Sequence, residues 1–180
     1  MEPKKILTID FDGVICGTPY PFKIGINKKI IQTQDSQKKA TVPPKFFRKP
    51  LDKLRYAFRP ILPDTYNALE SLFSKRRLIL LTGRRSDPTK WLKKYHLEQF
   101  FTKIIFNNTE YNSSYYKLNK IIELDANEHI DDDMQTIHLL SDSTNCKLFL
   151  RSWKYNEAYS ASNNITRVSG LYALSKLTDD

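Results

Sequence analysis

The sequence contains few of the residues that build disulfide frameworks or zinc sites. Of its 180 residues, two are cysteines (Cys16 and Cys146) and three are histidines. The cysteines lack the close spacing of a metal site, so we expect free thiols in a reducing compartment. The histidines (His96, His129 and His138) are scattered and form no zinc-binding cluster. A disulfide-stapled scaffold and a zinc-dependent function are therefore disfavoured.

Long hydrophobic runs are also absent. The apolar stretches are short, such as residues 78–81, and fall far below the roughly 20 residues that a membrane-spanning helix needs. The first residues, among them Glu2, Lys4 and Lys5, contain no apolar signal-peptide core. We therefore expect a cytoplasmic protein with no membrane partner.

Acidic residues are fewer than basic ones, and the imbalance is local. The chain has 29 Lys and Arg against 20 Asp and Glu, a formal net charge of +9 at pH 7. Residues 28–59 hold ten Lys or Arg against Asp35 and Asp52, so this basic segment carries +8 of that charge. A concentrated positive charge favours an anionic partner, such as a phosphorylated small molecule, a nucleic acid or an acidic surface. A solvated surface loop would have the same composition, so charge alone leaves these interpretations open.

Strand-like and helix-like patterns alternate along the chain. The length and the 40% hydrophobic content suit a single domain over residues 1–180. Short apolar runs predict buried strands at 5–10, 77–82, 103–106, 128–130 and 147–150. Apolar residues at helical spacing predict helices at 63–74, 89–101, 115–124, 134–140 and 170–177. This alternation predicts an α/β fold, a three-layer Rossmann-like open parallel sheet of about five strands with helices on both faces.

One segment interrupts this alternation. About fifty residues with six prolines separate the first strand from the first helix, which is too long for an ordinary connection. Loops of this length are usually functional lids or disordered. Residues 45–58 contain enough aromatic and aliphatic side chains to pack against the core, with a short helix expected after Pro50. We therefore interpret residues 18–59 as a flap or small cap inserted after the first strand.

The first strand ends in Asp10-Phe11-Asp12-Gly13-Val14. Because side chains alternate along an extended chain, Asp10 and Asp12 can project the same way. Two adjacent carboxylates repel each other, which raises the pKa of one of them, and a divalent cation relieves this conflict. Gly13 permits the sharp turn that follows. The motif therefore indicates a site for a hard cation, although a turn with two exposed aspartates would have the same sequence.

With three further motifs in order, the chain resembles the haloacid dehalogenase-like hydrolase superfamily. That superfamily opens with an apolar strand followed by Asp-x-Asp-Gly, as at residues 5–13. Its second motif is an apolar strand ending in Ser or Thr, which residues 78–82 match. Its third is a lysine near a helix start, for which Lys117 fits best, and its fourth is a strand ending in acidic residues, matched by residues 129–133. Together the motifs extend from the first predicted strand to the fifth.

The resemblance implies a Mg²⁺-dependent phosphomonoester hydrolase with an aspartyl-phosphate intermediate, from a small-cap or capless, nucleotidase-like subgroup. Asp10 would be the nucleophile, and Asp12 the general acid and then the general base. Acidic residues would bind the Mg²⁺, namely Asp10, Asp12 through its backbone carbonyl, Asp131 and Asp132. A second set would bind the substrate phosphate, namely Thr82, Gly83, Arg84 and Lys117. The implied substrate is an anionic phosphorylated molecule, a nucleotide or another small phosphomonoester.

Several assignments stay open. Lys120 competes with Lys117 for the lysine role, although Lys117 opens the helical face. Asp133 competes with its two neighbours for the metal and also suits the N-cap of the following helix. Trp153 and Tyr155, after the fifth strand, are interpreted as packing residues. A phosphorylated nucleic-acid end is an alternative substrate, contacted by the aromatic side chains and charges of the basic segment. A catalytically silent binding protein is a third interpretation, and the oligomeric state is undetermined.

Overall fold

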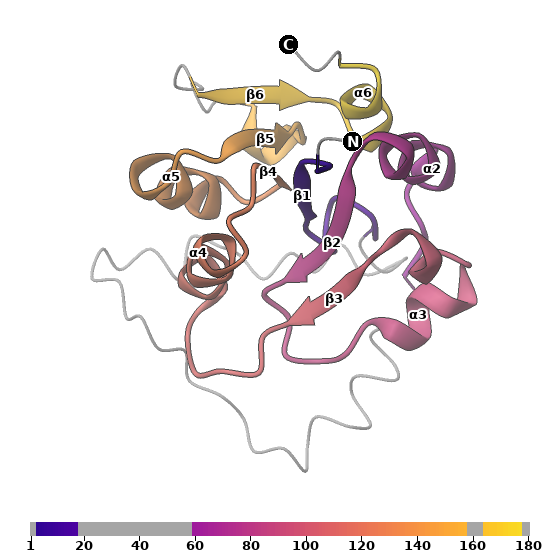
Figure 1. Ribbon diagram of the computed structural model, residues 1–180, viewed down its shortest axis with the longest axis horizontal. Coiled ribbons are helices and arrows are strands. Elements are labelled where there is room, and N and C mark those ends of the chain that lie inside the picture. Colours follow the sequence, from indigo (N-terminus) through magenta and orange to yellow (C-terminus); the bar gives the residue numbers. More distant parts are fainter. Residues whose placement is uncertain (1–2, 18–58, 158–163, 178–180) are drawn as a thin grey trace.

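The core of the molecule is a parallel β-sheet (Figure 1). A computed structural model of the chain describes residues 3–17, 59–157 and 164–177. All neighbouring strands pair in parallel, in the order β3-β2-β1-β4-β5-β6. The strands are β1 (Ile6–Ile9), β2 (Arg77–Thr82), β3 (Lys103–Phe106), β4 (Glu128–Asp131), β5 (Lys147–Arg151) and β6 (Ile165–Val168). The predicted α/β fold is therefore confirmed.

Among the described residues the sheet has six strands, where sequence analysis predicts about five. The additional strand, β6, lies at one edge of the sheet and pairs only with β5 among the described strands. Of its four residues, Ile165 and Val168 are buried and the two between them are partly exposed. An edge strand of this kind lacks the continuous apolar run that marks the central strands of a parallel sheet.

Helices cover both faces of the sheet, as Figure 1 shows. The helices are α2 (Thr65–Lys75), α3 (Thr89–Lys94) and α6 (Leu171–Ser175) on one face, and α4 (Ser113–Glu123) and α5 (Met134–Ser143) on the other. Two hydrophobic clusters fill the spaces between the layers. One contains Leu69, Leu92 and Leu174, and the other contains Tyr116 and Ile137. The predicted three-layer arrangement is confirmed.

The helix predicted at 89–101 is wrong beyond Lys94. The chain turns at His96, whose φ of 54° lies in the left-handed region and cannot continue an α-helix. Leu97 N then donates to Leu92 O at 2.9 Å, and His96 N donates to Lys93 O at 3.1 Å. These two bonds form the Schellman motif that commonly ends helices. A separate 3₁₀ turn follows at Glu98–Phe100, so the apolar residues of this segment come from two short elements.

The helices α4 and α5 begin with side-chain caps. The Asn112 side chain accepts a hydrogen bond from Tyr115 N at 3.0 Å, which starts α4 two residues before the predicted position. The Asp133 side chain accepts from Thr136 N at 3.3 Å and from Thr136 Oγ1 at 2.8 Å at the start of α5. Such caps satisfy backbone N–H groups that have no partner within the helix. They fix the two helix starts next to the ends of the strands.

Most of the predicted flap, residues 18–58, lies outside the described residues, and so does the helix expected after Pro50. The described chain on either side of it is held together by backbone hydrogen bonds. Gly17 N donates to Pro60 O at 2.9 Å, and Leu62 N donates to Ile15 O at 2.9 Å. The insertion therefore begins and ends beside the loop that follows β1.

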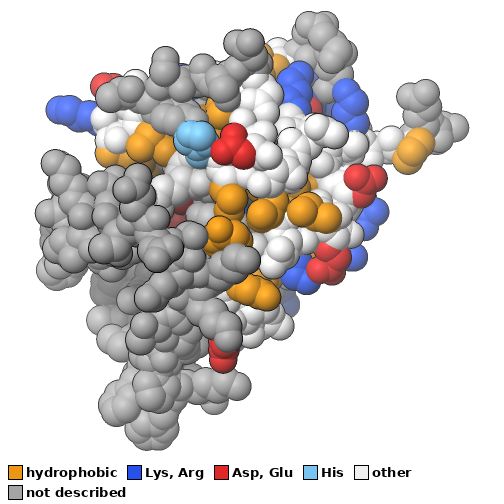
Figure 2. All heavy atoms as spheres, turned by 90° about the vertical axis from the view of Figure 1, so that its left-hand side faces the viewer, with side chains coloured by type: hydrophobic (Ala, Val, Ile, Leu, Met, Phe, Trp, Pro, Cys, Tyr) orange, Lys and Arg blue, Asp and Glu red, His pale blue; other side chains and the backbone are white. Residues whose placement is uncertain are grey.

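Figure 2 shows the α4 and α5 side of the molecule, where hydrophobic side chains lie among scattered charged ones. Ile122, on α4, is 60% exposed. Single exposed apolar residues of this kind are ordinary on protein surfaces.

Within the described part of the chain, no helix combines the length and the apolar character needed to cross a membrane.

Candidate active site

A pocket of about 450 Å³ opens at the carboxyl ends of the central strands. Its lining includes side chains from the end of β1 or the loop after it (Asp10, Asp12), from the end of β2 (Thr82), from α4 (Lys117) and from the end of β4 (Asp131). The strands β1 and β4 are neighbours, and the strand order changes direction between them. Open α/β sheets bind their ligands at this kind of topological switch point.

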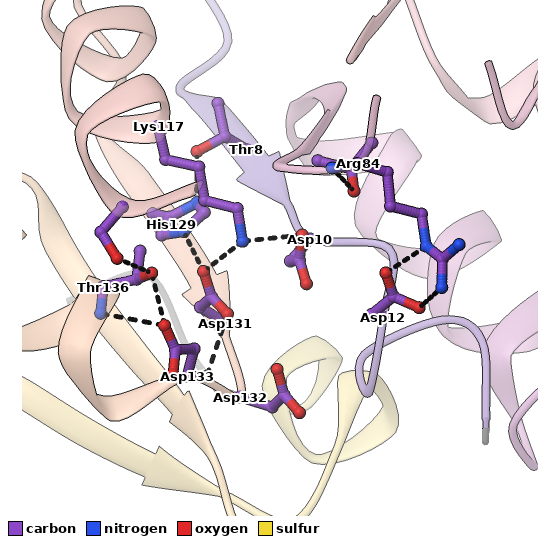
Figure 3. A network of polar contacts seen from close by, with 12 residues as sticks. Thr8, Asp10, Asp12, Arg84, Lys117, His129, Asp131, Asp132, Asp133 and Thr136 are labelled. Atoms are coloured by element: carbon purple, nitrogen blue, oxygen red, sulfur yellow. Dashed lines mark hydrogen bonds and ion pairs between the residues drawn. The ribbon is translucent and has the colours of Figure 1, made fainter. Parts of the chain in front are cut away.

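The centre of the site is a buried lysine between two buried aspartates (Figure 3). Lys117 Nζ lies 2.8 Å from Asp10 Oδ1 and 2.7 Å from Asp131 Oδ2. The Lys117 side chain is 3% exposed, and those of Asp10 and Asp131 are 5% and 0% exposed. Lys117 therefore joins α4 to the ends of β1 and β4 through two ion pairs that water does not screen.

These ion pairs set the charge of the site. Burial raises the pKa of Asp10 well above its ordinary value; Asp131, Asp12 and Asp132 raise it further, and Lys117 offsets this only in part. Burial would also raise the pKa of Asp131, but Lys117 and His129 outweigh it and hold this pKa below its usual range. Burial opposes the charge of Lys117, yet its two carboxylate partners raise its pKa overall. The pKa values of the two carboxyl groups beside Lys117 are therefore shifted in opposite directions, that of Asp10 upward and that of Asp131 downward.

Three carboxylates converge on one point at the wall of the pocket. Ligand oxygens of Asp10, Asp131 and Asp132 all lie within 4.8 Å of one another. Gly13 makes this arrangement possible because its φ is +72° and a Cβ atom there would lie 2.1 Å from Asp132 Oδ2. Carboxylate oxygens are the ligands that Mg²⁺ and Ca²⁺ use in proteins. The group therefore fits a hard divalent cation.

Asp12 faces the opposite side of the pocket from Lys117 and is bound by two arginines (Figure 3 shows one of them). Arg84 Nη2 donates to Asp12 Oδ1 at 2.8 Å and Arg84 Nε donates to the other carboxylate oxygen, which is a bidentate contact. Arg59 also donates to Asp12, and its own carbonyl accepts from Trp91 Nε1 at 3.2 Å. Burial would raise the pKa of Asp12, but Arg84 and Arg59 outweigh it and lower this pKa.

The end of β2 supplies a hydroxyl and a close contact. Thr82 Oγ1 accepts from Arg84 N at 3.2 Å, and as far as the described residues go its hydroxyl proton is available to an acceptor in the pocket. A Cβ atom on Gly83 would lie 1.9 Å from Ser113 Oγ, so only glycine lets this loop approach the start of α4. Thr82 and Gly83 are both part of the pocket lining, and their role in binding phosphate stays a prediction.

The structure separates the residues that sequence analysis left as alternatives. Lys120 pairs with Glu123 at 2.5 Å on the exposed side of α4, whereas Lys117 lies in the pocket. Asp133 caps α5, and its backbone N donates to Asp131 Oδ1 at 3.0 Å. Asp132 joins Asp10 and Asp131 in the carboxylate group. The geometry therefore favours Lys117 over Lys120, and Asp131 with Asp132 over Asp133.

Sequence analysis missed several residues that contact the site. Arg59 is placed only in the basic segment, and His129 opens the fourth motif without a role of its own. Two residues interpreted as packing also make polar contacts: Trp153 Nε1 donates to Gly13 O at 3.0 Å, and the Tyr155 hydroxyl donates to Asp132. No motif assigns a role to these residues, because their contacts depend on how distant parts of the chain pack together.

Comparisons of the sequence alone give no relative. No protein-family model matches the chain, and no curated protein is significantly similar to it.

Comparisons of the structure give a consistent answer. A haloacid dehalogenase-like phosphatase from Thermococcus onnurineus has a TM-score of 0.63 at 18% identity, over 96% of each chain. The L-2-haloacid dehalogenase from Xanthobacter autotrophicus has a TM-score of 0.63 at 12% identity, over 97% of this chain and 98% of that one. A haloacid dehalogenase-like hydrolase from Streptococcus pneumoniae has a TM-score of 0.56 at 15% identity, over 83% of this chain and 85% of that one. The chain therefore has the haloacid dehalogenase-like fold that sequence analysis predicts.

Proposed function

We propose that this protein is a Mg²⁺-dependent phosphomonoester hydrolase that forms an aspartyl-phosphate on Asp10. One observation carries the proposal, the pairing of the buried Asp10 with Lys117 at 2.8 Å inside a pocket that also contains Thr82 and Asp12. A nucleophilic carboxylate, a cation beside it, a hydroxyl donor and a second carboxylate are the groups that phosphoryl transfer to an aspartate needs.

The carboxylate group supports the choice of cation. Asp10, Asp131 and Asp132 supply three oxygen ligands within 4.8 Å of one another, and Lys117 neutralises only part of their charge. Oxygen-only donor sets of this kind suit Mg²⁺. When bound there, Mg²⁺ would favour the ionised form of Asp10 and screen its charge from the incoming phosphate.

In the first half of the reaction, a carboxylate oxygen of Asp10 attacks phosphorus. The bond between phosphorus and the leaving oxygen breaks, and Asp12 in its protonated form gives that oxygen a proton. Thr82 donates a hydrogen bond to one phosphate oxygen, and the Lys117 ammonium offsets the charge that develops on the group. Preorganised donors of this kind stabilise a transition state by several kcal/mol.

In the second half, Asp12 takes a proton from a water molecule that attacks the aspartyl-phosphate. The bond between phosphorus and the Asp10 oxygen breaks, so Asp10 is regenerated and inorganic phosphate leaves. The ionised state of Asp12 beside Arg84 suits this base role, while the acid role needs that contact to loosen. Arg84 lines the pocket, and a substrate phosphate offers it a second anion of higher charge. We therefore assign Arg84 to the substrate phosphate as well as to Asp12.

The same residues argue against the other interpretations. A dehalogenase of this superfamily lacks the second aspartate of the Asp-x-Asp motif, and here Asp12 is present and lies in the pocket. A catalytically silent member would have lost Asp10 or Asp12, and both are in place. Hydrolysis of a phosphomonoester is therefore the activity that the site supports best.

The substrate class remains a separate prediction. We expect a nucleotide or another small phosphomonoester, and a phosphorylated nucleic-acid end is the alternative that the basic segment raises. Of that segment, residues 28–58 lie outside the described residues. Hydrolysis of a phosphorylated oligonucleotide and of a mononucleotide should be compared as salt rises. A steep loss with the oligonucleotide alone would favour the nucleic-acid end, because phosphate contacts along a strand are strongly salt-dependent.

The test of the chemistry is hydrolysis of p-nitrophenyl phosphate with Mg²⁺, with EDTA, and by the Asp10→Asn variant. We expect turnover that requires Mg²⁺ and is lost in Asp10→Asn. Asp142→Asn is the matched control, because Asp142 is 68% exposed and pairs only with His138 among the contacts given for its side chain. Activity of Asp10→Asn equal to that of Asp142→Asn would refute the assignment of the nucleophile.

A further inference from the structure

A buried histidine connects the core of the sheet to the carboxylate group. His129 lies on β4, next to β1, and its side chain is fully buried. His129 Nδ1 lies 2.8 Å from Thr8 Oγ1, and His129 Nε2 lies 3.2 Å from Asp131 Oδ2 (Figure 3). The chain Thr8–His129–Asp131 therefore runs from the middle of β1 to the site, and both ring nitrogens have a partner.

The chemistry of this chain selects one tautomer. Thr8 has a single hydroxyl proton and faces two acceptors, His129 Nδ1 at 2.8 Å and Glu128 O at 3.1 Å. If the proton sat on Nδ1 instead, the Nε2 lone pair would point at the Asp131 carboxylate, which is repulsive. With the proton on Nε2, Thr8 donates to Nδ1, the nearer of its two acceptors, and Nε2 donates to Asp131, so both contacts of the ring join a donor to an acceptor.

This donor decides how Asp131 presents its oxygens. Asp131 Oδ2 receives Lys117 Nζ at 2.7 Å and His129 Nε2 at 3.2 Å, which fills both of its lone pairs. Asp131 Oδ1 accepts only Asp133 N, at 3.0 Å, among the hydrogen bonds given for it. One lone pair of Oδ1 therefore remains for a ligand, and His129 holds the carboxylate in that orientation.

We propose that His129 is a positioning residue that orients the Asp131 carboxylate so that its Oδ1 binds the divalent cation. This inference rests on the cation site of the proposed function and adds a residue to which the motifs assign no role. Partners of metal ligands fix the orientation of those ligands, and their removal typically weakens metal binding about 10- to 100-fold. An apolar residue at position 129 would fill the same space in the core but would leave Asp131 Oδ2 one donor short.

Three variants separate donation by His129 from packing. His129→Gln keeps a side-chain N–H near the position of Nε2, His129→Leu removes it at similar volume, and Thr8→Val removes the hydroxyl that fixes the tautomer. Binding of Mn²⁺ and Mg²⁺ to each purified protein is measured by calorimetry without substrate. Thermal unfolding in EDTA establishes that each variant is folded. Nitrogen NMR of the wild-type histidines in EDTA identifies the tautomer independently of any metal.

We expect His129→Leu to bind the cation about 10- to 100-fold more weakly than wild type. His129→Gln should recover about tenfold or more of that loss, since hydrogen bonds to charged groups are worth that much. Thr8→Val should fall between wild type and His129→Leu, and the wild-type His129 spectrum should show the proton on Nε2. Wild-type affinity in a folded His129→Leu would overturn the proposal, as would equal affinities of the Gln and Leu variants or a proton on Nδ1.

If His129→Leu does not fold, unchanged affinity of Thr8→Val or the wrong tautomer still overturns the role of His129. A wild-type protein that binds neither cation would overturn the proposed function itself, and this inference with it. A wild type that binds and a His129→Leu variant that binds equally well would overturn this inference alone.

Discussion

Replacing Lys117 with methionine is the perturbation whose effect can be worked out most fully from the structure. Methionine has a similar length and no charge, so it fills the space of the lysine chain between α4 and the sheet. The variant leaves Asp10 and Asp131 buried without their shared cation. Asp10 can adopt its neutral form, because burial already raises its pKa. Asp131 keeps the hydrogen bonds from His129 and Asp133 N, which favour its ionised form, so it becomes the uncompensated charge.

The magnitude follows from that one charge. Removing one partner of a buried ion pair typically costs about 3–5 kcal/mol. Since Asp10 absorbs part of the change by protonation, and His129 and Asp133 N still donate to Asp131, we expect the lower end, about 3 kcal/mol. For a chain of this size each kcal/mol shifts the Tm by about 2–4 °C, so the Tm of Lys117→Met should fall by about 6–12 °C.

The assay is urea and thermal unfolding in EDTA at neutral pH, with Lys120→Met as the matched control. Lys120 lies on the same helix and pairs with Glu123, but its side chain is 27% exposed and that of Glu123 is 63% exposed. Exposed pairs contribute about 0–1 kcal/mol, so the control should change little. The double variant Lys117→Met with Asp131→Asn should recover stability, because it removes the uncompensated charge.

A Lys117→Met variant no less stable than Lys120→Met would refute this reasoning, since the charge of the buried ammonium would then contribute nothing to the free energy of unfolding. A double variant less stable than Lys117→Met would refute it as well. Added Mg²⁺ should stabilise Lys117→Met more than wild type, because a cation at the carboxylates would compensate the lost charge.

Three further predictions follow from the same structure. Gly13→Ala should destabilise the protein by about 1–2 kcal/mol and displace Asp132, because Gly13 has a positive φ and its Cβ would lie 2.1 Å from Asp132 Oδ2. Gly170→Ala is the control and should fold and bind Mg²⁺ normally, because its Cβ would lie 3.5 Å from its nearest neighbour. Equal effects of the two substitutions would contradict this. Burial raises the pKa of the Cys16 thiol to about 11 and that of the Cys146 thiol to about 12, so iodoacetamide at pH 8 should label them only after denaturation. Rapid labelling of the native chain would contradict this. Burial would raise the pKa of Asp131, but Lys117 lowers this pKa overall, so the stability that ionised Asp131 contributes is present above about pH 4 and is lost as the pH falls further. In EDTA, wild type should therefore lose more stability than Asp131→Asn between pH 5 and pH 3. Parallel losses in the two proteins would argue against this role of Asp131.

The central strands were predictable from the sequence, because a strand that is buried on both faces has a continuous apolar run. The order of the reactive residues at the ends of these strands was predictable with them. β1 and β2 are buried almost throughout; Asp10 directly follows β1 and Thr82 ends β2, so the run and the reactive residue are adjacent in sequence. The edge strand β6 and the break of the predicted helix at His96 were missed for a related reason. Both depend on tertiary context, one on pairing with β5 and the other on a left-handed residue that packs Leu97 into the core.

The contacts between site residues could not be predicted from short stretches of the sequence, because they depend on how separate elements pack together. Lys117 is 14 residues from Asp131 and 107 from Asp10, and it is distinguished from Lys120 only by the face of α4 that meets the sheet. A helical repeat can rank the two lysines, but the ion pairs exist because the fold brings Lys117 of α4 to the ends of β1 and β4. His129 is two residues from Asp131, yet its role depends on Thr8 in the neighbouring strand.

Arg84 is an example of a residue that is predicted to bind a ligand and that contacts another side chain in the structure. Sequence analysis assigns its guanidinium to a phosphate, and in the structure that guanidinium makes a bidentate contact with Asp12. Carboxylate and phosphate present the same pair of acceptor oxygens to an arginine, so an arginine poised for one binds the other. The contact that lowers the pKa of Asp12 is then the contact that a phosphate dianion would compete for. The predicted and observed partners of Arg84 would therefore share one binding geometry, and we expect a substrate phosphate to compete with Asp12 for it.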